Sequence, residues 1–248
     1  MTILLLYILY AVAISLLLSL KGYRSKTTSS KAKAPHKFEK ILIVGATGGT
    51  GRELVKQSLT RGYEVTALVR DPARLGIEDP NLKIVTGDVR DPASVEEAVR
   101  GQQAVVSALG HKRFFYPTNI LSDGTRNIIN SMKNLGASRF ICQTSLGIGD
   151  SAWRMGLYYT LLVIPIILPF YFFDKTRQER LIADSGLEWV IVRPGALNNS
   201  AKRDLLRHGT GVGGFLLTVR ISRADVAGFM LDQLESNDYL GSAPGVSW

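Results

Sequence analysis

Cysteine is almost absent from this chain, which has a single one, Cys142, among 248 residues. One cysteine cannot form a disulfide within the chain, so a disulfide-stapled scaffold is excluded and a reducing compartment is favoured. Because Cys142 follows Phe140 and Ile141 in an apolar run, we expect it in the core rather than as a reactive thiol.

Histidine is also scarce. His36, His111 and His208 are scattered and lack the spacing of metal ligands, so we predict no metal site and place all three on the surface or in loops. Internal repeats are absent as well, which excludes a repeat architecture.

Acidic residues are fewer than basic ones, and the net charge is +9. Residues 21–40 alone hold seven basic residues against Glu39, a net of +6. The basic character therefore belongs mainly to one segment, and we expect no nucleic-acid partner.

The run Thr2–Leu20 has 19 uncharged residues, mostly Leu, Ile, Val and Ala. That length suits one membrane-spanning helix. The alternative is a cleavable signal peptide, which needs basic residues before the apolar run and a small-residue cleavage site after it. Here the basic residues follow the run. We therefore predict an uncleaved single-pass anchor, with the rest of the chain on the cytosolic side.

Three regions follow from this reading: a transmembrane anchor over 1–20, a basic linker near anionic headgroups over 21–39, and a domain over 40–248. Within the domain, strand and helix patterns alternate, which predicts an α/β fold with a parallel sheet covered on both faces. The predicted strands are 40–45, 64–69, 82–86, 103–107, 139–144 and 188–193, and the predicted helices are 49–61, 93–100, 118–136, 174–185 and 222–235.

The stretch from Ile41 to Gly51 reads as a buried strand, a glycine-rich turn and the start of a helix. Gly45, Gly48 and Gly51 would let the chain turn sharply and a diphosphate approach the backbone, with the helix N-terminus facing the anion. The alternative, a plain tight turn, explains one glycine well and three poorly. We predict a dinucleotide site that also includes Thr47, Gly49 and Thr50.

The second predicted strand ends at Arg70, and Arg74 follows closely. An arginine at this point accommodates a 2′-phosphate, so NADP(H) is the favoured cofactor. Asp71 keeps NAD(H) possible, and Arg70 could instead be a solvated strand end.

Further cofactor contacts are expected at the ends of the next strands. Asp88 could accept from the adenine amino group or be a turn residue, and Val89 follows it. The residues Ala108, Leu109 and Gly110 lie where the cofactor would pass.

Several motifs together resemble the atypical short-chain dehydrogenases/reductases, in particular the NAD(P)H-binding NmrA-like and biliverdin reductase B (flavin reductase)-like group. They are Gly45–Gly51, Leu68–Asp71, Gly87–Val89, Ser122–Ile128 and Gly186–Gly195. The resemblance covers about residues 40–241. It implies one Rossmann-type domain with a doubly wound parallel sheet, a diphosphate on the glycine loop, the 2′-phosphate on Arg70 and adenine on Asp88. It also implies that Thr144 and Ser145 lie beside the nicotinamide and that Pro194 lines the cofactor's other end.

Typical members reduce carbonyls with a tyrosine acid and a lysine four residues later, helped by a serine. Ser145, Tyr171 and Lys175 match that order and form the candidate catalytic set, and Lys175 could also touch the cofactor ribose. Biliverdin-reductase-like relatives lack the tyrosine, so an interfacial Tyr171 is the alternative.

The run 157–173 contains 17 uncharged residues, near the lower limit for a span. A span would place the fifth and sixth strands on opposite sides of the membrane, and Pro165 and Pro169 break a regular helix. We predict a surface flap that dips into the bilayer and forms an apolar mouth. The alternative is an oligomer interface or a core segment.

Together these features predict a membrane-tethered NAD(P)H-dependent oxidoreductase, preferring NADPH, for a small hydrophobic carbonyl, quinone, flavin or tetrapyrrole-like substrate. The alternative is a non-catalytic NADP(H)-binding regulator or assembly factor of NmrA-like type. The oligomeric state is left open.

Overall fold

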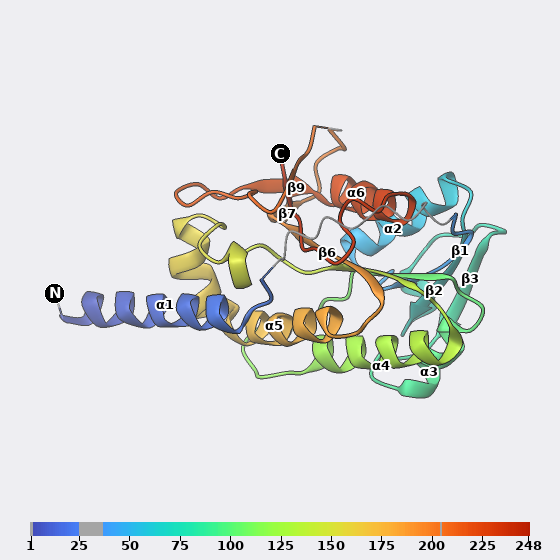
Figure 1. Ribbon diagram of the computed structural model, residues 1–248, viewed down its shortest axis with the longest axis horizontal. Coiled ribbons are helices and arrows are strands. Elements are labelled where there is room, and N and C mark those ends of the chain that lie inside the picture. The colour runs from blue at the N-terminus through green and yellow to red at the C-terminus, as the bar shows by residue number, and fades with distance from the viewer. Residues whose placement is uncertain (1, 25–36, 204) are drawn as a thin grey trace.

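A computed structural model describes residues 2–24, 37–203 and 205–248 (Figure 1). Its main sheet has the strand order β3-β2-β1-β4-β5-β6-β10-β8, in which all neighbours are parallel except β10 and β8. The strands are β1 (Lys40–Val44), β2 (Glu64–Val69), β3 (Leu82–Thr86), β4 (Ala104–Ser107), β5 (Arg139–Gln143), β6 (Glu188–Pro194), β8 (Arg207–Gly209) and β10 (Gly245–Ser247). The first six form the strand order of a Rossmann fold.

Helices cover both faces of this sheet (Figure 1). One face packs against α2 (Gly49–Thr60) and α6 (Arg223–Glu235), and the other against α3 (Pro92–Val99), α4 (Ile120–Leu135) and α5 (Pro169–Ala183). Strand β1 shows the period of two: Ile41 and Ile43 join the first core, while Leu42 and Val44 join the second. The predicted doubly wound α/β fold is confirmed.

The predicted strands and helices match the structure closely, and Ser222 caps α6 as expected, accepting from the Asp225 backbone N–H. The prediction missed four strands of three residues each, β8, β10 and the separate parallel pair β7 (Ala196–Asn198) and β9 (Arg220–Ser222). A strand of three residues is too short to show the alternation of apolar and polar side chains by which strands are predicted. The prediction also began the fifth domain helix at residue 174, whereas α5 begins at Pro169. The start was missed because residues 169–173 are all apolar and such a run shows no helical period.

Helix α1 (Thr2–Lys21) is docked on the domain along one face. Ala11, Ser15 and Leu18 are buried, whereas most other apolar side chains of the helix are exposed. Its end packs tightly, since a Cβ on Gly22 would lie 2.2 Å from the backbone nitrogen of Gly149. By length and composition, α1 is the one described single helix that could cross a membrane. Most of the predicted linker, including His36, lies outside the described residues.

The run 157–173 is not one straight helix. Residues Tyr159–Ile167 form a π-helix, η3, with Pro165 inside it, and α5 begins two residues after its end. The axis turns by 96° between η3 and α5. The prediction that the prolines interrupt a regular helix is therefore confirmed. Leu18 of α1 packs with Ile148, Ile164 and Phe172 in a third, smaller core.

A buried ion pair joins α5 to the sheet. Arg193 of β6 and Glu179 of α5 are 1% and 0% exposed, and the Arg193 Nη2–Glu179 Oε2 distance is 2.7 Å. Glu179 also accepts from the Thr144 hydroxyl at 2.7 Å, and Arg193 donates to the Tyr23 carbonyl at 2.9 Å. The pair thus connects β6, α5, the end of β5 and the chain leaving α1.

We predict that Glu179→Ala lowers the free energy of unfolding by about 3–5 kcal/mol, because it leaves a buried guanidinium without its main counter-ion. Denaturant unfolding of the detergent-solubilised chain, followed by circular dichroism, measures the change. The control is Arg126→Ala, which removes an exposed pair with Asp123 and should cost less than about 1 kcal/mol. Equal losses for the two variants would contradict the assignment.

Candidate functional site

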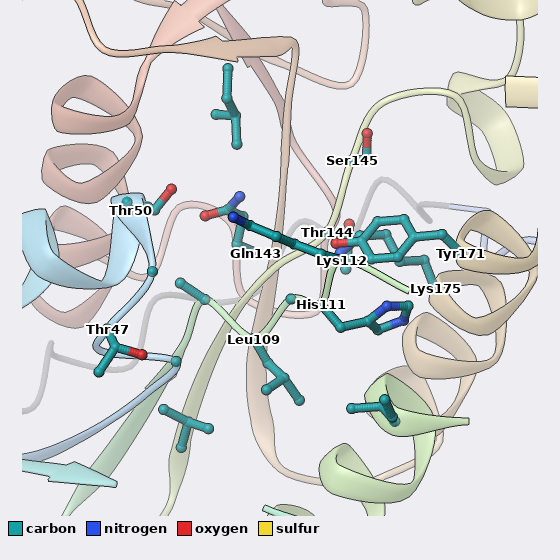
Figure 2. A pocket seen from close by; sticks show the side chains of 18 of the residues that line it. Thr47, Thr50, Leu109, His111, Lys112, Gln143, Thr144, Ser145, Tyr171 and Lys175 are labelled. Carbon is teal, nitrogen blue, oxygen red and sulfur yellow. The ribbon is translucent and has the colours of Figure 1, made fainter. Parts of the chain in front are cut away.

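A cavity of about 800 Å³ lies along the carboxyl ends of the strands, from the glycine turn after β1 to the start of α5 (Figure 2). It includes the point where the strand order reverses between β1 and β4, which is where ligands bind in open α/β sheets. Its volume is within the range of ligand pockets.

The glycine turn is packed too tightly for side chains at two positions. Gly45 has a φ of +80°, and a Cβ there would lie 2.6 Å from the Ala108 carbonyl oxygen. A Cβ on Gly51 would lie 2.0 Å from the carbonyl oxygen of Gly45. These contacts require glycine, and they bring α2 directly against the end of β1, as in dinucleotide-binding turns.

The N-terminus of α2 opens into the cavity. Gly48 is its N-cap residue and supplies no side-chain cap, and Gly48, Gly49 and Thr50 line the cavity. The first backbone N–H groups of a helix lack partners within the helix. An anion such as a diphosphate would satisfy them and would be stabilised by the helix dipole. Thr47 lies beside them (Figure 2).

Five arginines line the cavity: Arg70 and Arg74 after β2, Arg90 after β3, Arg113 after β4 and Arg223 at the start of α6. Arg223 was missed in the sequence. Its side chain passes over Gly49, where a Cβ would lie 2.4 Å from its Cδ, and its Nη1 donates to Asn199 Oδ1 at 2.6 Å. The sequence held one signal for Arg223. A basic residue in the first turn of a helix interacts unfavourably with the helix dipole, so its presence there indicates another role.

Asp88 lines the cavity beyond Arg70. Both of its carboxylate oxygens accept from the Arg90 side chain, at 3.1 and 2.9 Å. These hydrogen bonds lower the pKa of Asp88 to about 2, so it is ionised at neutral pH. Val89 is buried against Gly124 of α4, where a Cβ would lie 2.8 Å from Val89 Cγ1.

Tyr171 and Lys175 lie one turn apart on α5, at the opposite end of the cavity from Thr47 and Thr50 (Figure 2). The Lys175 ammonium is 5.0 Å from the centre of the Tyr171 ring. Lys175 is only 3% exposed, yet among the described residues no hydrogen bond or ion pair to its ammonium is seen. A buried ammonium facing a cavity is ready for an oxygen-bearing ligand.

The loop after β4 completes this end of the cavity. Ala108, Leu109 and Gly110 line it as predicted, and a Cβ on Gly110 would lie 3.4 Å from the Tyr171 hydroxyl. His111 was expected on the surface or in a loop, and it does lie in this loop, partly buried in the cavity wall with its ring centre 4.9 Å from that of Tyr171. Desolvation lowers the pKa of His111, so its ring is neutral at pH 7.

The two residues after β5 point in different directions. The Thr144 hydroxyl is buried and donates to Glu179. The Ser145 hydroxyl lies at the cavity wall, apart from the Tyr171 ring (Figure 2). The structure therefore brings Tyr171 and Lys175 together and leaves Ser145 apart from them, since successive side chains of an extended segment alternate in direction.

Pro194 lines the cavity wall, as expected. Apolar side chains at this end also include Tyr159, Leu168 and Phe172, which belong to the run 157–173 that was expected to form an apolar mouth. Phe114 and Met155 join them from two loops outside that run.

The residues present fit a dinucleotide. The turn is a cradle that side chains at Gly45 or Gly51 would fill, the N-terminus of α2 has no side-chain cap, and the arginines would face a phosphate. The cavity beyond them ends at Tyr171 and Lys175.

Comparison with known proteins agrees with this geometry. A family model described as NAD(P)H-binding matches residues 45–237. An uncharacterized chloroplastic protein of Arabidopsis thaliana is 32% identical over 191 residues, covering 72% of this chain and 68% of that protein. The photosystem II assembly factor Ycf39 of Cyanophora paradoxa is 26% identical over 157 residues, covering 62% of this chain and 44% of that protein. An uncharacterized Mycobacterium tuberculosis protein is 29% identical over 154 residues, and the chain spans only 14% of its length.

Solved structures share the fold. A Rossmann-fold NAD(P)-binding family protein from Shigella flexneri has a TM-score of 0.65 and 26% identity, covering 85% of this chain and 94% of its own. A short-chain dehydrogenase/reductase from Veillonella parvula, in complex with NADP, has a TM-score of 0.71 and 16% identity, covering 86% and 95%. ChuY, an anaerobilin reductase from Escherichia coli O157:H7, has a TM-score of 0.68 and 23% identity, covering 84% and 96%.

We predict that Gly51→Ala weakens NADPH binding by more than about tenfold, or 1.4 kcal/mol, because its Cβ would push α2 away from the Gly45 carbonyl. Fluorescence titration with NADPH measures the affinity. The control is Gly211→Ala, since Gly211 has open space around its Cβ position and no positive φ. Unchanged affinity in Gly51→Ala would argue against the turn as the diphosphate site.

Proposed function

The chain belongs to the NAD(P)H-binding family of atypical short-chain dehydrogenase/reductase-like proteins, and from this premise we propose that it is a membrane-tethered, NADPH-preferring oxidoreductase with a hydrophobic substrate. The observation that carries the proposal is the Tyr171–Lys175 pair at the end of the cavity away from the glycine turn. A carbonyl, quinone, flavin or tetrapyrrole-like compound would bind there.

The basic residues at the other end support a preference for NADPH. Arg70 and Arg74 follow β2, where a 2′-phosphate would lie, and Arg223 approaches from α6. Asp88 does not oppose this preference strongly, since Arg90 engages both of its carboxylate oxygens. Asp88 and Val89 would border the adenine.

In the proposed reaction, NADPH supplies a hydride when bound. Tyr171 would then donate its hydroxyl proton to the substrate oxygen as that oxygen gains negative charge. The Lys175 ammonium beside the ring would stabilise the phenolate left behind and could bind a ribose hydroxyl. Gly110 leaves space in front of the Tyr171 hydroxyl, and the apolar side chains around it would exclude water.

Helix α1 supports the tether. It has 20 residues, and an 18-residue window within it has a mean hydropathy of 2.6, which suits a bilayer span. Lys21 is its last residue and Arg24 follows it, so the domain would face the cytosol.

The alternative function is a non-catalytic NADP(H)-binding assembly factor. One observation favours it: similarity to a protein named as a photosystem II assembly factor. On this account the cavity would hold the cofactor without turnover.

We predict that Arg70→Ala weakens NADPH binding by about 10- to 100-fold, the equivalent of one charge-assisted hydrogen bond. NADH affinity should change by less than about threefold, because NADH lacks the 2′-phosphate. Parallel titrations with the two cofactors measure the difference, and Arg126→Ala on exposed α4 surface serves as the control. An equal loss for both cofactors would remove Arg70 as the 2′-phosphate ligand.

We also predict that Tyr171→Phe lowers kcat by about 10²–10⁴-fold while NADPH binding persists, because only the proton donor is lost. NADPH oxidation is measured with quinones, flavins and aldehydes, with Tyr116→Phe, an exposed tyrosine, as the control. An unaffected rate would refute the role of Tyr171. Tight NADPH binding by the unaltered chain without turnover on any compound would support the assembly-factor alternative.

A further inference from the structure

We infer that η3 enters the bilayer beside α1 as a re-entrant segment, and that the loop Phe215–Leu217 contacts lipid next to it. The cavity would then open to the membrane, and its substrate would be a lipophile dissolved in the bilayer. This inference rests on the proposed membrane tether.

Two hydrogen bonds between α1 and η3 are the first support. Pro165 lies inside η3 and Pro169 begins α5, so this stretch lacks two backbone N–H donors. In a π-helix a carbonyl accepts from the N–H five residues later, so the Leu161 carbonyl still faces the N–H of Ile166. Helix α1 adds side-chain donors to this irregular backbone: the Tyr7 hydroxyl donates to the Leu161 carbonyl and the Tyr10 hydroxyl to the Pro165 carbonyl, the latter at 2.9 Å.

The position of Tyr7 and Tyr10 along α1 would place these two hydrogen bonds inside the bilayer. Tyr7 lies 14 residues before Lys21, about 21 Å along a helix. If Lys21 lies at the headgroups, Leu161 is inside a hydrocarbon core about 30 Å thick. A carbonyl without a donor costs several kcal/mol there, and irregular backbone is tolerated in a membrane only where the protein satisfies it.

The surface around these contacts is apolar. The segments 155–173 and 211–219 contain no charged residue. They are joined by backbone hydrogen bonds from Gly156 to Gly214 and from Leu157 to Leu216. The exposed large side chains of these two segments are Tyr158, Leu162, Ile166, Ile167, Phe170, Phe215, Leu216 and Leu217.

The backbone of η3 and of the loop 211–219 lies at the end of the molecule from which α1 projects (Figure 1). Phe215, Leu216 and Leu217 are 58–80% exposed, which is unusual for three consecutive large apolar residues facing water. Contact with lipid would remove the free-energy cost of exposing these three side chains to water. Because α1 would place the bilayer at this same end, lipid is the occupant that the arrangement favours.

The apolar surface is continuous with the cavity wall. Tyr159 of η3 and Leu168, which follows η3, line the cavity together with Tyr171. A substrate entering beside η3 would therefore reach Tyr171 without crossing water, which restricts the substrate class to membrane-soluble compounds.

The test uses the full chain in phosphatidylcholine vesicles, with a fluorescent probe on single introduced cysteines. Cys142 is fully buried and does not compete for labelling. The variants are Ile166→Cys in η3, Leu216→Cys in the loop, Leu5→Cys in α1 and the matched control Ile84→Cys on β3. Doxyl-labelled phosphatidylcholine should quench all of the first three and leave Ile84→Cys unchanged.

Each other outcome overturns the inference. Quenching at position 5 alone would mean that only α1 enters the bilayer, with the tether intact. No quenching at position 5 would overturn both the tether and the inference. Unquenched but solvent-shielded probes at 166 and 216, with a dimeric mass in detergent, would assign the surface to a second copy. NADPH oxidation, measured separately, tests the proposed reaction independently of all four probes.

Discussion

The buried pair Arg193–Glu179 determines where α5 lies, and the site depends on α5. Burying two charges is costly unless their geometry and hydrogen bonds are good, and here Glu179 accepts from both Arg193 and Thr144. Glu179 lies four residues after Lys175, which lies four residues after Tyr171, so the three follow one side of the helix. Fixing Glu179 against the sheet therefore directs Lys175 and Tyr171 toward the carboxyl ends of the strands.

A second polar contact fixes α5 from its other side. Asp174 is buried and accepts from the backbone N–H groups of Leu121 and Ser122 at 2.8 and 3.2 Å, so it caps α4 in place of Asn119, which makes no side-chain cap. Helix α5 is thus held by buried polar contacts more than by an apolar stripe. It also begins directly after η3, so the candidate catalytic residues and the candidate lipid-facing segment belong to one continuous stretch of chain.

These tertiary contacts explain which features the sequence could predict. The first six strands carry β-branched apolar runs, and the glycine turn requires glycine for local steric reasons, so both were predictable from short windows. Strands β7 to β10 have three residues each and form only because distant partners are present. Arg223 and His111 reach the cavity through packing, far in sequence from the glycine turn. Ser145 matched a motif order, but order alone does not determine side-chain direction.

Both acidic residues of α5, Asp174 and Glu179, are engaged by other groups. Asp174 is engaged by the N-terminus of α4, and Glu179 by Arg193, so neither carboxylate is available to the adjacent Lys175. The described structure gives its buried ammonium only the face of Tyr171. A buried cation without a carboxylate partner lowers the stability of the folded protein. Proteins keep such destabilising features mainly at functional sites. Lys175 therefore supports the proposal that this end of the cavity binds a ligand, whether the chain is an enzyme or a cofactor-binding assembly factor.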